Sequence, residues 1–159
     1  MAPAVAPVPQ NAAALPMFTA PLPDPTLLHP AAAPQPPEVS IVVPMFNEAE
    51  SLPDLVARVG EAMQASGRSF ELIAIDDGSR DGTPALLRQL ARERPWLRPV
   101  CLARNYGQSC ALQAGFDRVR GRYVVTLDAD LQNDPLDIPA LLDRLDAEPE
   151  LDSLSGWRQ

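Results

Sequence analysis

The sequence contains no lysine, so all 13 of its basic residues are arginine. A P-loop needs a lysine at its nucleotide phosphates, and the Asp-based phosphatases and phospho-receiver domains need one as well. The absence therefore counts against all of these classes. The 21 acidic residues give a net charge of −8. Because a general nucleic-acid binder needs a basic face, we expect no nucleic-acid partner.

Histidine and cysteine are also scarce. The single histidine, His29, lies in a proline-rich stretch, where we expect it to be solvated and to bind no metal. The cysteines, Cys101 and Cys110, lack CxxC spacing. This favours a reduced cytosolic chain in which both cysteines serve as small packing residues.

Long apolar runs are missing as well. No run approaches the roughly eighteen apolar residues of a membrane-spanning helix. The first basic residue is Arg58, so the positively charged start of a secretory signal is absent. We expect a cytoplasmic protein.

Residues 1–37 are instead dominated by alanine and proline. Proline fixes φ and removes a backbone donor, so this segment joins a helix or sheet with difficulty. We predict a disordered or semi-extended leader over 1–37, followed by one folded domain over 38–159. The leader is either a plain tether or a ligand for partner domains.

From Glu38 onward, apolar segments typical of strands alternate with segments of helical spacing. The predicted strands cover 39–43, 70–75, 99–103 and 123–127, with a further strand at 151–154. This alternation predicts an α/β fold with a mostly parallel, Rossmann-like sheet and right-handed crossovers. We expect the strand at 123–127 to be buried because it is rich in β-branched and aromatic residues.

The helices between these strands have recognisable start signals. Asn47 is a predicted N-cap, with Glu50 positioned to answer it. Thr83 followed by Pro84 predicts a second start. A small-residue helix follows Gln108, and another helix follows Asp134 and Pro135.

Polar clusters follow the predicted strands at 44–48, 76–79, 104–108 and 128–132. In parallel sheets, ligands bind beyond the carboxyl ends of the strands. We therefore expect these clusters to form one functional site.

Asp128 and Asp130 alternate with Ala129 and so point the same way where a strand ends. Their charges repel each other, and a bound Mg²⁺ or Mn²⁺ would remove that repulsion while leaving positions for phosphate oxygens. The alternative is a solvated acidic turn that caps the next helix.

Other polar residues also have more than one interpretation. The segment Asp76-Asp77-Gly78-Ser79 offers carboxylates to a nucleobase or ribose, or forms an Asx-type turn. Arg104 neutralises a phosphate or forms a surface ion pair. Arg158 has the same alternatives, or is frayed at the chain end.

Four segments in this order, VSIVVPMFNE (39–48), IDDGS (75–79), RNYG (104–107) and LDADLQ (127–132), resemble family 2 glycosyltransferases. The resemblance is greatest to the dolichyl- or polyprenyl-phosphate sugar synthases and covers residues 38 to 158. It implies a GT-A nucleotide-diphospho-sugar transferase fold. It also implies transfer of a sugar from a nucleoside-diphosphate sugar to a polyprenyl phosphate or related acceptor, at the cytoplasmic face of the membrane.

The resemblance also implies roles for individual residues. Pro44, Phe46 and Glu48 would line the base pocket, and Asp76 and Asp77 would hold the base and ribose, with Arg104 part of the same substrate site. Asp128, Asp130 and Gln132 would surround Mg²⁺ or Mn²⁺ on the diphosphate. Arg158, within Ser155-Gly156-Trp157-Arg158, would meet the phosphates, and Asp130 and Arg158 are the expected catalytic residues.

The implied chemistry is inverting attack by the lipid phosphate on the anomeric carbon, with the metal as Lewis acid. An anionic attacking group needs no strong base, which suits a site without histidine. The sequence departs from the family at Phe46, where tyrosine is frequent, at 133–135, where two prolines are usual, and at 151–154, which is unusually polar.

Two other functions are weighed. The chain ends where the family continues into its acceptor-binding segment, so a C-terminally truncated nucleotide-sugar-binding module without transfer activity is the alternative. A phosphatase with Asp128 as nucleophile and Asp130 as acid is disfavoured by the missing lysine and the short remainder.

Overall fold

The computed structural model describes residues 35–156. The expectations for His29, for Arg158 and for almost all of the leader therefore lie outside the described residues.

The sheet has four strands in the order β3-β2-β1-β4, and each neighbouring pair is parallel. The strands are β1 (Val39–Met45), β2 (Phe70–Asp76), β3 (Leu97–Cys101) and β4 (Tyr123–Thr126). The predicted parallel α/β sheet is confirmed, although β3 begins two residues earlier than expected. The strand expected at 151–154 is wrong. Leu151 N–H instead donates to the carbonyl of Glu148 in a turn, and the polar residues after it are exposed.

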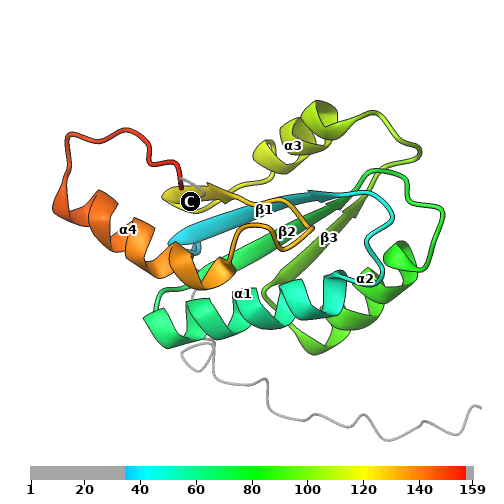
Figure 1. Ribbon diagram of the computed structural model, residues 1–159, viewed down its shortest axis with the longest axis horizontal. Helices are drawn as coiled ribbons and strands as arrows, with labels where there is room; N and C mark the ends of the chain where they lie inside the picture. Colours follow the sequence, from blue (N-terminus) through cyan, green and yellow to red (C-terminus); the bar gives the residue numbers. More distant parts are fainter. Residues whose placement is uncertain (1–34, 157–159) are drawn as a thin grey trace, which may run out of the picture. The chain divides into compact units, whose positions relative to one another are not determined.

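Helices cover both faces of this sheet (Figure 1). One face carries α1 (Leu52–Ser66), α2 (Thr83–Glu93) and α4 (Ile138–Ala147), and the 3-10 turn η2 (Pro135–Asp137) precedes α4. The opposite face carries α3 (Gln108–Phe116). Alternate residues of β1 serve the two sides. Ile41 and Val43 belong to the core with α1, α2 and α4, whereas Val42 packs with Ala111 of α3.

The predicted small-residue helix, α3, packs closely on the sheet. A Cβ atom at Gly115 would lie 2.4 Å from Cγ1 of Val42 and 2.9 Å from Cδ1 of Ile75. Real Cβ contacts are longer than this, so a larger side chain at Gly115 would push α3 away from β1 and β2. Glycine is therefore required at this point for packing.

The predicted cap at Asn47 is wrong, whereas the predicted helix start at Thr83 and Pro84 is confirmed, with the N-cap position one residue earlier. The N-cap positions are Ser51 for α1 and Gly82 for α2, each without a side-chain cap. Asn47 lies in a left-handed conformation with φ 59°, and its side chain contacts the loop after β2. The local cap pattern was overridden because tertiary hydrogen bonds use the same polar groups.

Two predictions of burial are also wrong. β4 is an edge strand of the sheet, and Val124 is 46% exposed because α3 leaves this part of the sheet face uncovered. Cys101 and Cys110 are exposed rather than packed inside. For Val124 and Cys101, position in the sheet decides the exposure, whereas Cys110 lies on the exposed side of helix α3.

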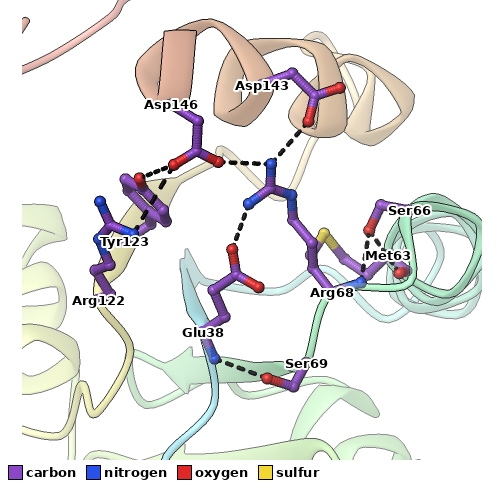
Figure 2. A network of polar contacts seen from close by, with 9 residues as sticks. All are labelled: Glu38, Met63, Ser66, Arg68, Ser69, Arg122, Tyr123, Asp143 and Asp146. Carbon is purple, nitrogen blue, oxygen red and sulfur yellow. Dashed lines mark hydrogen bonds and ion pairs between the residues drawn. The ribbon is translucent and has the colours of Figure 1, made fainter. Parts of the chain in front are cut away.

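A polar network connects α4 to the amino ends of the strands (Figure 2). Arg68, just before β2, pairs with Glu38. Its Nη2 also donates to Asp143 at 2.7 Å and to Asp146 at 2.8 Å. The hydroxyl of Tyr123 donates to Asp146 at 2.5 Å. One guanidinium thus holds α4 against the start of the sheet.

A second network surrounds Glu71, which is only 2% exposed. Its carboxylate accepts from Nη1 of Arg98 at 2.5 Å, from Nη2 of Arg120 at 2.6 Å and from the hydroxyl of Ser40 at 2.7 Å. Burial raises the pKa of Glu71, but the hydrogen bonds from Arg120, Ser40 and Arg98 outweigh it and lower the pKa below its ordinary value. This buried charge is therefore fully compensated.

Candidate functional site

A cleft of about 420 Å³ opens at the carboxyl ends of the strands. The predicted convergence of polar clusters is observed, because segments that follow all four strands of the sheet line this cleft. Its lining residues are Pro44, Met45, Phe46, Glu48, Asp77, Asn105, Gly107, Gln108, Ala111, Asp128, Ala129 and Asp130. The structure therefore brings six of the predicted site residues together: Pro44, Phe46, Glu48, Asp77, Asp128 and Asp130.

Asp128 and Asp130 lie after β4 and are both exposed. Oδ1 of Asp128 accepts from Nε2 of Gln108 at 3.0 Å, and Oδ1 of Asp130 accepts from the N–H of Gln132 at 3.1 Å. Within residues 35–156, neither carboxylate forms an ion pair. Their negative charge therefore faces the cleft without a cationic partner from the described residues.

This pair suits a hard divalent ion that keeps open positions. Among the residues that the structure describes, no three His, Cys, Asp or Glu side chains gather to hold a metal completely. Mg²⁺ and Mn²⁺ are commonly bound by one or two carboxylates, with water and substrate phosphates completing the shell. The donor set at Asp128 and Asp130 therefore fits a metal that binds together with a phosphorylated ligand. Gln132 is exposed and is not among the residues that line the cleft.

Asp77 follows β2, lines the cleft and is only 3% exposed. Its carboxylate oxygens accept from the N–H groups of Tyr106 and Gly107, each at 2.8 Å. These bonds hold the loop after β3 against the end of β2. Carboxylate oxygens have further lone pairs, so Asp77 can also accept from a ligand hydroxyl in the cleft.

Asp76 is buried and does not line the cleft. Its Oδ1 accepts from the N–H of Ser79 at 3.1 Å. The side chain thus closes the turn that follows β2, which is the Asx-type arrangement left open by the sequence. Gly78, with φ 70°, allows this turn, because a Cβ there would lie 2.3 Å from the carbonyl carbon of Arg104.

Arg104 is exposed beside the cleft. It lines a second hollow of about 470 Å³ together with Phe46, Arg80 and Asn105. Its guanidinium carbon lies 4.8 Å from the centroid of the Tyr106 ring. Across the described part of the chain it forms no ion pair, so its charge is available to an anionic ligand.

Glu48 and Phe46 lie in the loop after β1 and form one wall of the cleft. The hydroxyl of Ser51 donates to Oε2 of Glu48 at 2.5 Å. The Phe46 ring is 41% exposed, so an apolar surface is open to a flat ligand group.

Sequence reasoning singled out no role for Asn105, Gly107 or Gln108, although all three line the cleft. The sequence did contain a signal for them, because they follow a predicted strand in the same way as Asp77 and Asp128 do. Gly107 has φ 92° and turns the chain into α3, which places Gln108 next to Asp128.

The family model for glycosyl transferase family 2 matches residues 40–158. The chain therefore belongs to glycosyl transferase family 2. A dodecaprenyl-phosphate galacturonate synthase of Rhizobium johnstonii is 50% identical over 123 residues, which are 77% of this chain and 36% of the relative. An undecaprenyl-phosphate 4-deoxy-4-formamido-L-arabinose transferase of Pseudomonas paraeruginosa is 50% identical over 107 residues, 67% of this chain and 32% of the relative.

Solved structures agree on the fold. The mannosyltransferase PcManGT of Pyrobaculum calidifontis, in complex with GDP-Man and Mn²⁺, matches with a TM-score of 0.61 at 27% identity, over 70% of this chain and 33% of that chain. TarS 1-349 of S. aureus matches with a TM-score of 0.60 at 18% identity, over 77% of this chain and 38% of its own, and supports the fold alone. The fold is GT-A, as the sequence motifs implied.

The chain spans about a third of the length of the curated relatives that it matches. Between residues 35 and 156, no helix has the length and apolar character needed to cross a membrane.

Proposed function

We propose that the cleft binds a nucleoside-diphosphate sugar together with Mg²⁺ or Mn²⁺, and that the protein transfers the sugar, with inversion, to a polyprenyl phosphate or related acceptor. The observation that carries this proposal is the meeting of Asp128 and Asp130 with Phe46 and Asp77 around one cleft. The first pair offers unneutralised oxygens to a metal diphosphate, and the second pair offers an aromatic face and a carboxylate to a nucleoside.

The residues have separate roles in this proposal. Phe46 contacts the base, while Glu48 and Asp77 accept hydrogen bonds from the nucleoside. Asp128 and Asp130, with Gln132 beside them, hold the metal, which when bound acts as a Lewis acid on the leaving diphosphate. Arg104 and Arg158 add positive charge for the phosphates. Asp76 contributes through the turn that it closes.

The attacking group in the proposed reaction is the acceptor phosphate. A phosphate oxygen attacks the anomeric carbon from the side opposite the departing nucleoside diphosphate, which inverts the configuration. Because this oxygen is already anionic, no side chain needs to remove a proton. The names of the relatives support a polyprenyl phosphate acceptor. Such a lipid lies in a membrane, and the cytoplasmic face is the side on which we propose that the reaction occurs.

A second candidate is a nucleotide-sugar-binding module without transfer activity. The observation in its favour is the cleft itself, whose lining residues suit a nucleotide ligand, whereas the matched 36% and 32% of the two relatives' length make transfer a proposal alone. Catalysis needs both reactants held in line, whereas binding needs the cleft alone.

A transfer assay distinguishes the transferase from the binding module. The protein is incubated with radiolabelled nucleotide sugars, Mn²⁺ and a polyprenyl phosphate. We expect labelled lipid from the wild type, a loss of at least about a hundredfold in Asp130→Asn because the metal site is broken, and wild-type rates in the exposed control Asp152→Asn. Binding of the nucleotide sugar without labelled lipid would favour the second candidate. Absence of both would contradict the proposed function.

A further inference from the structure

The loops after β1 and β2 are joined by a set of hydrogen bonds, here called the loop brace, between residues 47–49 and residues 79–83. The consecutive N–H groups of Asn47, Glu48 and Ala49 each donate to a side chain of the other loop. The acceptors are Oγ of Ser79 at 2.8 Å, Oγ1 of Thr83 at 2.9 Å and Oδ2 of Asp81 at 3.2 Å, respectively. In return, Oδ1 of Asn47 accepts from the N–H of Arg80 at 2.9 Å.

Thr83 is the central residue of the loop brace. It is fully buried at 0% exposure, and its hydroxyl accepts from the N–H of Glu48, which is itself partly buried, so loss of this acceptor would weaken the pairing of that N–H. The same residue organises Asp81, whose Oδ1 accepts from the N–H of Thr83 at 2.9 Å. Hydrogen bonds from the side chain and backbone of Thr83 also hold the pKa of Asp81 below its ordinary value, which agrees with its place as an acceptor in the loop brace.

The loop brace fixes the wall of the cleft. Phe46 and Glu48 lie on either side of Asn47, and both line the cleft. Asn47 lies at φ 59°, a left-handed conformation that asparagine adopts more readily than most residues other than glycine, and the loop brace holds it there from both its N–H and its side chain. Within residues 35–156, the loop brace supplies the hydrogen bonds that join the second loop to residues 47–49, next to the backbone bond from Asp77 N–H to the carbonyl of Met45 at 2.9 Å.

We propose that Thr83, with Ser79 and Asp81, is a positioning residue for nucleotide-sugar binding. It acts through the backbone of residues 47–49 on the Phe46 ring and the Glu48 carboxylate. The loop brace itself stands on the hydrogen bonds alone, whereas the identity of the ligand rests on the proposed function.

The test compares two changes at Thr83 with different chemistry. Thr83→Val keeps the shape but removes the acceptor, and Thr83→Ser keeps the hydroxyl. We expect Thr83→Val to speed amide hydrogen exchange at Glu48 about tenfold and to weaken nucleotide-sugar binding about tenfold. Thr83→Ser should restore both to near wild-type values, and the control Thr126→Val, in exposed β4, should change neither. Ser79→Ala, at a half-buried site, repeats the test at Asn47 if Thr83→Val does not fold.

The outcomes are distinguishable. Unchanged exchange at Glu48 in Thr83→Val would overturn the loop brace. Faster exchange with unchanged nucleotide-sugar affinity would overturn the positioning role. A wild-type protein that binds no nucleotide sugar would overturn the proposed function, and the exchange rates would still decide on the loop brace.

Discussion

The two ends of the sheet use carboxylates in opposite ways. At the amino ends of the strands, arginines neutralise them. Arg68 does so for Asp146 (Figure 2), and Arg98 and Arg120 do so for Glu71. At the carboxyl ends, Asp128 and Asp130 meet only neutral donors in the described part of the chain. The carboxylates paired with arginine are therefore structural, whereas Asp128 and Asp130 are available for a ligand.

The difference follows from desolvation. A buried carboxylate such as Glu71 is tolerated because charged hydrogen bonds replace its water. An exposed pair such as Asp128 and Asp130 keeps its water but also keeps its mutual repulsion, which a cation would relieve. Ion pairing, rather than the number of acidic residues, thus distinguishes a structural cluster from a candidate metal site.

The largest expected effect on stability comes from Glu71→Gln. The substitution leaves Arg98 and Arg120 without their shared anion, and we expect a loss of about 2 kcal/mol in the free energy of unfolding, because both arginine side chains are partly exposed to water. Urea denaturation measures it, with exposed Glu61→Gln as a control that should change by less than about 0.5 kcal/mol. If Glu71→Gln folds but loses metal-dependent nucleotide binding, the claim that the two ends of the sheet have separate roles would be contradicted.

A smaller effect is expected for Arg68→Gln, because its partners Asp143 and Asp146 are exposed to water. We expect a loss of about 1 kcal/mol, which shrinks in 1 M salt as charges are screened (about 3 Å Debye length). The control is Arg144→Gln, which breaks an exposed pair with Glu148 and should cost less. A salt-independent loss would show that packing of the arginine stem, not charge, holds α4.

The smallest expected effect concerns how the free energy of unfolding falls at acidic pH, here called the acid limb of the stability curve. Because the folded pKa of Glu71 is lowered, its carboxylate stabilises the fold fully above its ordinary pKa of about 4.3. As the pH falls through that value and then through the lower folded pKa, the unfolded chain takes up the proton first and stability is lost. Glu71→Gln should therefore show a shallower loss between about pH 5 and pH 2. Equal slopes would mean that Glu71 contributes nothing to the acid limb.

The division between the ends was partly predictable from the sequence. Strands such as β1 and β2 have strong apolar patterns, and the rule for parallel sheets places Phe46, Asp77 and Asp128 at one edge. Neighbouring residues therefore sufficed to predict the α/β fold and the convergence of the site.

The remaining features depend on residues that are distant in the sequence. Asn47 carries a local cap signal, but its partner is Arg80. Val124 has a strand pattern, but its exposure depends on where α3 lies. Asp77 was expected to hold a ligand, and its bonds to Tyr106 and Gly107 depend on how two loops meet. Local patterns do not contain such information.

The central claim is that Asp128 and Asp130 bind a divalent ion together with the diphosphate of a nucleotide sugar. A ligand that binds only the folded state raises the free energy of unfolding, by about 2.7 kcal/mol at a hundred times its Kd. The decisive measurement is therefore the melting temperature with a nucleoside diphosphate, in Mn²⁺ and in chelator.

We expect a rise in melting temperature only when nucleotide and Mn²⁺ are both present. We also expect no rise in Asp130→Asn, whose metal-free stability should stay within about 0.5 kcal/mol of the wild type because the residue is exposed. An equal rise in chelator, or a full rise in Asp130→Asn, would contradict the account.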